Sequence, residues 1–152
     1  MFYFVWDSSL ETGIDIIDSQ HRRIVDYINE LHDAIGNKDK HEVEHVLNQL
    51  IDYTVTHFTF EESLQEKAGY QHLVAHKAVH KAFTDRVLSY KERFDKGEDV
   101  SKKLLSDLRI WLTNHIKQED GDYVPAVKAH LHKDQDKGWL TKTLGKLFGT
   151  AK

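Results

Sequence analysis

Two pairs of side chains that commonly bind metals lie between positions 57 and 80, and the members of each pair are four residues apart. His57 and Glu61 form the first pair, and His76 and His80 form the second. Residues i and i+4 lie on the same face of an α-helix, so each pair can direct both side chains to one point. Imidazole and carboxylate groups are ligands for iron, zinc, copper and manganese. The stretch therefore predicts helices that carry a metal site.

Four segments of the chain carry apolar residues three and four positions apart, a spacing that predicts amphipathic helices. The fourth helix is expected to close at Gly121 and Pro125. Because short loops join the segments, we expect an all-α fold, an antiparallel up-down-up-down four-helix bundle with a C-terminal helical extension. Residues 1–125 would form the bundle domain with its N-terminal arm, and residues 126–152 would form the extension.

The bulk properties of the chain limit its location and its partners. Its 152 residues fit one domain, and its net charge of −4 gives a nucleic-acid-binding role no electrostatic support. The absence of cysteine excludes disulfides, thiolate metal ligands and cysteine nucleophiles. The N-terminus has acidic residues where a signal peptide needs basic ones, and no apolar run approaches the roughly 20 residues of a membrane span. We therefore expect a cytoplasmic protein.

Histidine and acidic side chains occur on all four predicted apolar stripes. The candidates that face the buried seam are His21, His57, Glu61, His76, His80 and His115, with Asp120 as a seventh. An unpaired carboxylate in such a seam costs roughly several kcal/mol, so it needs a proton, a partner or a metal. Asp120 lies about 140° from His115 around an ideal helix, so the two share a face only if the helix loosens or ends at Gly121.

The number of candidate ligands fits two metals. Two six-coordinate metals need about twelve bonds. The imidazoles would give about five bonds, two bridging carboxylates about four, and a bridging oxide or hydroxide about two. Roughly one coordination position would then stay open, and a small molecule such as O2 could bind there next to a redox metal. The ligand types alone would also admit zinc or manganese.

These residues and their order resemble the hemerythrin family, and specifically the bacterial hemerythrins. The resemblance covers roughly residues 6–124 and is carried by Trp6, GIDIIDSQH ending at His21, HFTFE at 57–61, HKAVH at 76–80 and HIKQED at 115–120. It implies reversible O2 binding at a di-iron centre that has a bridging oxide or hydroxide. Oxygen storage, or delivery of oxygen to enzymes that use it, is the function expected from this resemblance.

The resemblance also assigns a role to each candidate residue. It implies that His76, His80 and His115 hold the coordinatively full iron, that His21 and His57 hold the iron that takes O2, and that Glu61 and Asp120 bridge the two. It implies an apolar O2 pocket at Ile24, Phe58, Trp111, Leu112 and Ile116. A dry pocket fits reversible binding because it keeps out water and protons. These five side chains are equally ordinary core residues on their stripes, so the pocket assignment competes with simple packing.

Two other functions fit the same ligand types. The iron pair could reduce O2, peroxide or nitric oxide, or the chain could be an O2 or iron sensor module. A histidine-rich ligand set with two carboxylates argues against the enzyme, because oxygen-activating di-iron enzymes resemble a carboxylate-rich pattern. We therefore expect an O2-binding protein that is not an enzyme.

The remaining histidines are expected at the surface. They are His32, His41, His45, His72, His130 and His132. Glu42 and His45 form one copy of the Glu-x-x-His motif of ferritin-like di-iron proteins, but that design needs two copies and this one lies opposite the apolar stripe.

The C-terminal tail carries a further apolar stripe at helical spacing. Its members are Trp139, Leu140, Leu144, Leu147 and Phe148, with lysines between them. We expect a short helix that packs on the outside of the bundle. The alternative is that residues 137–152 form a basic amphipathic helix that docks on a membrane surface or on a partner such as an oxygen-using enzyme.

Overall fold

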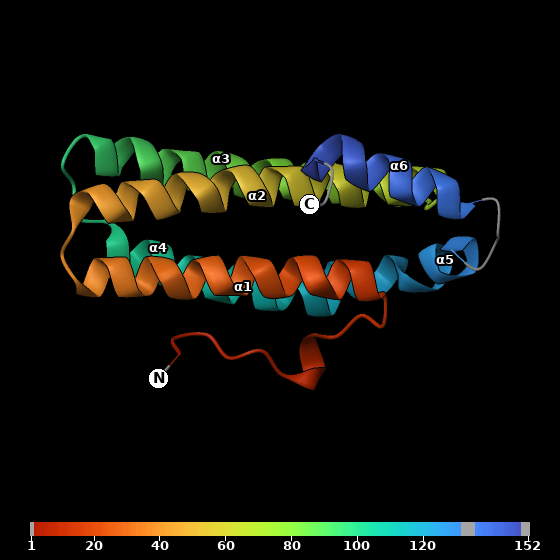
Figure 1. The fold of residues 1–152 in the computed structure, drawn as a ribbon, viewed down its shortest axis with the longest axis horizontal. Coiled ribbons are helices and arrows are strands. Elements are labelled where there is room, and N and C mark those ends of the chain that lie inside the picture. The colour runs from red at the N-terminus through yellow and green to blue at the C-terminus, as the bar shows by residue number, and fades with distance from the viewer. Residues whose placement is uncertain (1, 132–135, 150–152) are drawn as a thin grey trace.

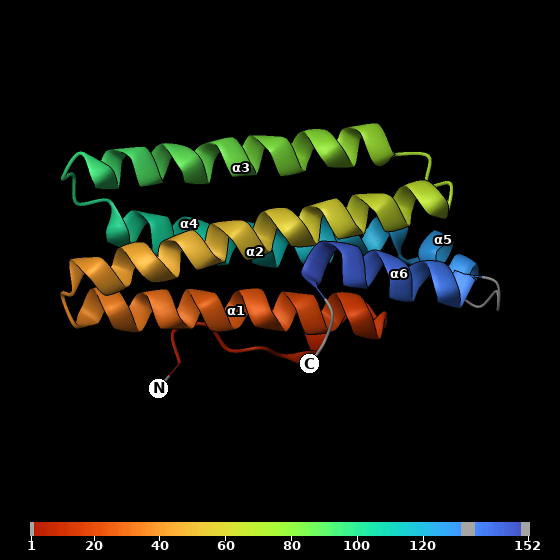
Figure 2. The ribbon, with the colours of Figure 1, turned by 45° about the horizontal axis from the view of Figure 1, so that its top comes forward.

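Four long helices run antiparallel along the molecule in up-down-up-down order (Figures 1 and 2). They are α1 (Asp15–Gly36), α2 (Lys40–Lys67), α3 (Leu73–Asp95) and α4 (Ser101–His115). The remaining elements are η1 (Ser8–Leu10), a 3-10 turn, η2 (Ile116–Asp120), a π-helical segment, and the helices α5 (Gly121–Leu131) and α6 (Asp136–Phe148). This computed structural model describes residues 2–131 and 136–149, and within them it contains no strand. The predicted all-α bundle is confirmed.

Local interactions explain where the helices begin and turn. The carboxylate of Asp18 in the first turn of α1 accepts hydrogen bonds from the backbone N–H groups of Thr12 and Gly13, at 2.8 and 3.1 Å. Asp39 caps α2 by accepting a hydrogen bond from the Glu42 N–H at 3.2 Å. Between α2 and α3 the backbone adopts a positive φ of 72° at Gly69, a conformation that glycine allows at no steric cost.

Buried apolar side chains form two clusters along the bundle. The first cluster lies among α1, α2, α3 and α4 and includes Ile28, Leu47 and Leu108. The second consists of Ile14, Ile17, Phe60, Leu64, Tyr123 and Val127. On α1, His21 lies between Ile17 of the second cluster and Ile24 of the first, and Asp120 lies between Ile116 of the first cluster and Tyr123 of the second. A polar layer thus separates two apolar cores.

The fourth helix does not close at Gly121 and Pro125, so that prediction was wrong. The chain stays helical from α4 through η2 and α5, and Pro125 lies inside α5. Proline removes one backbone donor from a helix. The helix continues because Tyr123 and Val127 on α5 are completely buried in the second cluster. The boundary between bundle and extension at residues 125 and 126 stays a prediction, and α5 runs across it.

The helix α6 packs on the outside of the bundle, beside α2 (Figure 2). Trp139, Leu140, Leu144 and Leu147 are partly buried against the second cluster. The expected short helix is therefore present, and most of its apolar stripe faces the protein. Among the described helices, none combines the length and apolar character needed to span a membrane.

Candidate metal centre

The fold brings all seven predicted ligands to one place in the polar layer. His21 comes from α1, His57 and Glu61 from α2, His76 and His80 from α3, His115 from the end of α4, and Asp120 from η2. Every one of these residues is at most 4% exposed. Two overlapping groups have ligand atoms close enough to hold an ion, one around His76, His80 and His115, the other around His21 and His57. Glu61 belongs to both groups.

The carboxylate of Glu61 lies between the two groups of imidazoles. Its Oε1 is 2.8 Å from His76 Nε2 and 3.0 Å from His80 Nε2. Its Oε2 is 3.3 Å from His57 Nε2 and 3.8 Å from His21 Nε2. One oxygen faces each group, which is the arrangement that a carboxylate needs to bridge two cations.

The carboxylate of Asp120 repeats this arrangement from the opposite helix. Its Oδ1 is 3.1 Å from His115 Nε2 and 3.2 Å from His76 Nε2. Its Oδ2 is 3.1 Å from His21 Nε2. The geometry therefore offers a second bridging carboxylate between the same two groups.

The π-helical segment η2 explains how Asp120 reaches the site. The backbone N–H of Gly121 bonds to the carbonyl of Ile116, five residues earlier. In such a segment residues five apart approach the same face, whereas in an α-helix they are about 140° apart. The sequence allowed Asp120 to share a face with His115 only if the helix loosens or ends there. The helix loosens after His115 and continues, so the loosening brings Asp120 to the site.

The donor atoms fit cations better than they fit one another. Both carboxylate oxygens of Asp120 and both ring nitrogens of His21 are buried without an ordinary hydrogen-bond partner. His80 Nε2 lies 3.0 Å from His115 Nε2, a distance at which the two nitrogens share either one proton or one metal. Adjacent ligands of an octahedral metal, each about 2.1 Å from it, lie about 3.0 Å apart. The spacing of these nitrogens thus suits neighbouring positions on one metal.

The acid–base state of the cluster also favours bound positive charge. Burial by itself raises the pKa of Glu61, but hydrogen bonds and charge from His57 and His76 hold it well below its ordinary value. Burial lowers the pKa of His76, but contacts with Asp120 and Glu61 outweigh this effect and raise it to about 9. Both shifts have the same origin, because buried carboxylates stay ionised only when protons or cations neutralise them.

Three polar residues that the sequence did not single out orient the predicted ligands. Gln20 Oε1 lies 2.6 Å from His57 Nδ1, and Glu62 Oε2 lies 2.7 Å from His80 Nδ1. The hydroxyl of Tyr123 donates a hydrogen bond to Glu61 Oε2 at 2.9 Å. Such contacts fix which ring nitrogen of a histidine faces a metal. Gln20 falls on the buried side of α1, and a polar residue on that side was the signal that could have identified it.

The predicted O2-pocket residues lie next to the cluster in the first apolar core. Ile24, Leu112 and Ile116 are 3 to 4% exposed. Phe58 stacks on the His80 ring with centroids 3.8 Å apart, and Trp111 stacks on the His115 ring at 4.3 Å. The structure thus brings Phe58 and Trp111 against imidazoles, and the role of all five side chains in binding O2 stays a prediction.

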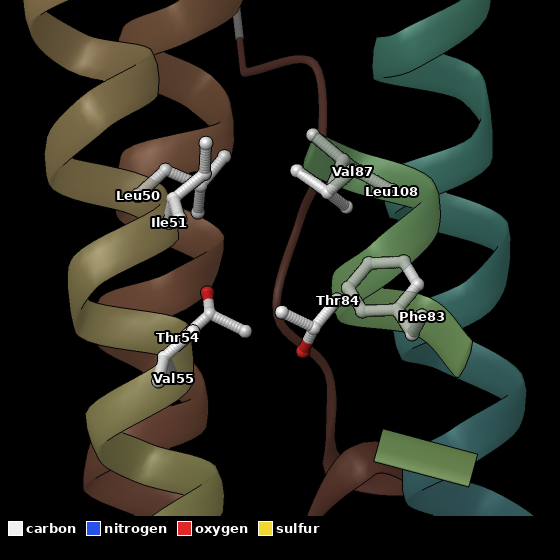
Figure 3. A pocket seen from close by; sticks show the side chains of 8 residues that line it. All are labelled: Leu50, Ile51, Thr54, Val55, Phe83, Thr84, Val87 and Leu108. Atoms are coloured by element: carbon white, nitrogen blue, oxygen red, sulfur yellow. The ribbon is translucent and has the colours of Figure 1, made fainter. Parts of the chain in front are cut away.

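A narrow apolar cavity lies between α2 and α3, close to these aromatic rings. Figure 3 shows Thr54 and Val55 of α2 facing Thr84 and Val87 of α3 across it. The Thr84 hydroxyl donates to the His80 carbonyl at 2.9 Å, and its methyl group points into the cavity. Phe83 lines the same cavity and stacks on Trp111 with centroids 3.7 Å apart. Phe83 therefore lies between this cavity and the Trp111 ring.

The other histidines stay outside the cluster. His41, His45 and His72 are exposed, as expected, whereas His32 and His130 are partly buried. His32 stacks on the Tyr3 ring with centroids 4.8 Å apart. His132 lies outside the described residues.

Comparison with known proteins identifies the family. Residues 12–127 match the model of the Hemerythrin HHE cation binding domain. The chain belongs to the hemerythrin family. The resemblance predicted from the five sequence motifs is thereby confirmed, and the matched range includes all seven candidate ligands of the polar layer.

Three members of the hemerythrin family are similar to this chain over different parts of its length. Bacteriohemerythrin of Pseudomonas aeruginosa (strain LESB58) is 46% identical, and the alignment covers 98% of this chain and all of the relative. Bacteriohemerythrin of Methylococcus capsulatus is 36% identical over 78% of this chain and 91% of the relative. A crystal structure of wild-type hemerythrin superposes with a TM-score of 0.78 at 33% identity, covering 82% of this chain and 98% of that one. Only the first of these three relatives spans nearly the whole chain, tail included.

Proposed function

We propose that this hemerythrin-family protein binds O2 reversibly at two iron ions held by the seven residues of the polar layer. His76, His80 and His115 hold one iron, His21 and His57 hold the other, and Glu61 and Asp120 bridge them. The observation that carries this proposal is that both carboxylates turn one oxygen to each histidine group. A pair of ferrous ions supplies, when bound, the electrons that O2 takes up on binding and returns on release.

The residues around the metals support release of O2 in place of its reduction. His21 and His57 give the second iron fewer protein ligands than the first has, which leaves room for O2 on that side. Ile24, Leu112 and Phe58 exclude water and protons from this side of the cluster, and a dry site slows the loss of reduced oxygen species. The Tyr123 hydroxyl stays protonated and donates its hydrogen bond to Glu61 Oε2, because burial and the nearby carboxylates raise the Tyr123 pKa well above its ordinary value.

The ligand set favours a carrier over a di-iron enzyme. Of the described residues, only Glu61 and Asp120 add carboxylate oxygens to the two metal-facing groups. The ligand set typical of oxygen-activating di-iron enzymes contains more carboxylates, and their negative charge stabilises more oxidised iron. Delivery of O2 to an oxygen-using enzyme and a cytoplasmic location were expected from the sequence, and both stay predictions.

The decisive experiment adds ferrous iron to the metal-free protein under argon and then admits air. We expect two irons per chain and a visible absorption band that appears in air and disappears when argon returns. His115→Ala, which removes one ligand from the first iron, should bind fewer than two irons and show no such band. Continuous O2 consumption beyond the amount that fills the sites would contradict the carrier and favour the enzyme.

A further inference from the structure

An open cleft between the start of α3 and the segment η2 reaches one of the predicted metal ligands. Its volume is about 330 Å³. The residues of its wall that matter here are Tyr70, His72, Ala75, His76, Glu119 and Asp122. Of the seven predicted ligands, His76 is the one in this wall, and it is 4% exposed whereas the other six are at most 2% exposed. The cleft thus leads from solvent to the metal centre.

The wall of the cleft is negatively charged. Glu119 and Asp122 contribute two carboxylates, and the described residues of the wall include no lysine or arginine. Asp122 accepts a hydrogen bond from the Tyr70 hydroxyl, and in the described part of the chain neither carboxylate forms an ion pair with a lysine or arginine. Lys77 follows His76 but lies about 100° around α3 from it. Clefts lined by one sign of charge attract ions of the opposite sign.

Polar groups continue from the cleft to both bridging carboxylates. Glu119 Oε2 lies 3.8 Å from His115 Nδ1, and both atoms are buried without a hydrogen-bond partner. His76 Nε2 lies 2.8 Å from Glu61 Oε1 and 3.2 Å from Asp120 Oδ1. An ion that reaches His76 therefore meets a further ligand atom at each step and crosses no apolar layer.

The position of the cleft also separates it from the predicted O2 pocket. The O2-pocket residues belong to the first apolar cluster or pack against it, whereas Tyr70 in the cleft wall packs against the second. An apolar gas gains nothing from two carboxylates, but carboxylate and imidazole both bind divalent transition metals. The chemistry of this wall thus suits a metal cation.

We propose that divalent transition-metal ions enter the polar layer through this cleft, where Glu119 and Asp122 attract the hydrated ion and His76 is the first ligand to bind it. The route rests on the proposed metal site and not on O2 binding. Because entry and exit follow the same path, a residue that acts on the route changes both rates and leaves the affinity nearly unchanged. A residue that only positions a ligand changes the affinity through faster release.

The first test removes the charge of the cleft and follows cobalt(II) uptake by the metal-free full chain, using visible absorption in stopped flow under argon. Glu119→Gln combined with Asp122→Asn keeps the side-chain sizes and an oxygen that accepts from Tyr70. We expect uptake about tenfold slower at low salt, with a smaller difference at high salt. The matched control, Asp26→Asn with Glu44→Gln, changes the net charge equally at exposed positions outside the cleft and should keep the wild-type rate.

The second test narrows the cleft without changing its charge. Ala75 is an exposed residue of α3 in the cleft wall, so Ala75→Phe should slow cobalt(II) uptake by the metal-free chain. Release from the loaded protein to a chelator should slow by the same factor. Ala78→Phe is the matched control, because it enlarges another exposed alanine of α3 that does not line the cleft, and it should keep both wild-type rates.

The equilibrium amount of bound metal separates the route from the site. We expect two cobalt ions per chain in wild type and in all four variants. Equal uptake rates in wild type, Ala75→Phe and the variant without the two acids would overturn the route. Faster release with unchanged uptake in the variant without the two acids would also overturn it and make Glu119 a positioning residue for His115. Failure of the wild type to bind two ions would overturn the metal site itself, and the route with it.

Discussion

The contact of the outer ring nitrogen orients two of the metal-facing imidazoles, those of His57 and His80. His80 turns Nε2 toward Glu61 while its Nδ1 lies 2.7 Å from the Glu62 carboxylate. Glu62 accepts a hydrogen bond from Nδ1–H, so the lone pair stays on Nε2, where a metal needs it. The carboxylate is partly exposed and is no ligand itself, so its contribution is to hold one tautomer and one ring orientation.

Removing this contact should weaken metal binding without removing a ligand. Loss of such an outer partner typically lowers metal affinity about ten- to a hundredfold, so we expect Glu62→Ala to lose iron to a chelator faster than wild type. Absorbance of the chelator complex measures the rate. Glu66→Ala is the matched control, because Glu66 is an exposed glutamate one turn later on α2. Equal rates for the two variants would show that Glu62 does not orient His80.

Leu112 belongs to the first apolar core and lies three residues before His115 on α4. We expect Leu112→Ala to cost about 2–5 kcal/mol of stability and to admit water near the metals. The oxygenated protein should then decay several times faster to the ferric form, as followed by its visible spectrum. Leu105→Ala removes an equally buried leucine from the same helix, distant in sequence from the ligands, and should cost similar stability without faster decay. A wild-type decay rate in Leu112→Ala would reduce Leu112 to a packing residue.

At the scale of elements, the π-helical turn η2 makes the difference between one bridging carboxylate and two. His115 Nε2 and Asp120 Oδ1 meet at 3.1 Å only because the helix takes an extra residue between them. A π-turn is less favourable than the α-helical turn that it replaces, and such segments occur frequently at functional sites. Here the cost is offset only if Asp120 finds positively charged partners.

Deleting Gln118, an exposed residue within η2, should restore an ordinary α-helix in which His115 and the aspartate are four residues apart and therefore on one face. We expect the deletion variant to stay helical by circular dichroism and to keep two irons per chain, as Gln118→Ala should. Asp120→Ala keeps the spacing of the π-turn but removes the carboxylate, and should bind at most one iron. Two irons in Asp120→Ala would show that Asp120 is dispensable as a bridge.

The helices and most of the site were predictable because both follow the α-helical period. His57 with Glu61 and His76 with His80 are four apart, and α-helical geometry alone places each pair on one face. Asp120 was not predictable in this way, because no periodicity marks a single π-turn, and only the family resemblance selected it.

The parts that the sequence did not reveal depend on contacts between distant segments. Gln20 meets His57 across 37 positions and Tyr123 meets Glu61 across 62, and neither pair has a local spacing rule. The continuation of the helix past Pro125 likewise reflects burial of its neighbours in the second cluster, which outweighs the local preference of proline.

At the scale of the whole molecule, a charged layer divides what would otherwise be one continuous apolar core. Among the residues that the structure describes, ten polar or charged ones are buried, and seven of these are the candidate ligands. Breaking up a core in this way destabilises a bundle, because each buried charge loses its hydration. Metal binding offsets this cost, since ions that bind only the folded state stabilise it by mass action.

The metal-free protein should therefore melt at a clearly lower temperature than the loaded one. With free metal at about a thousand times its Kd, the gain is about 4 kcal/mol, and a chain of this size gains about 2–4 °C per kcal/mol. We expect scanning calorimetry to show a rise of about 8–16 °C when ferrous or zinc ion is added under argon. Magnesium, which prefers oxygen ligands to imidazole, should give almost no shift. An unchanged melting temperature with ferrous and zinc ions would show that the buried histidines and carboxylates neutralise one another without a metal.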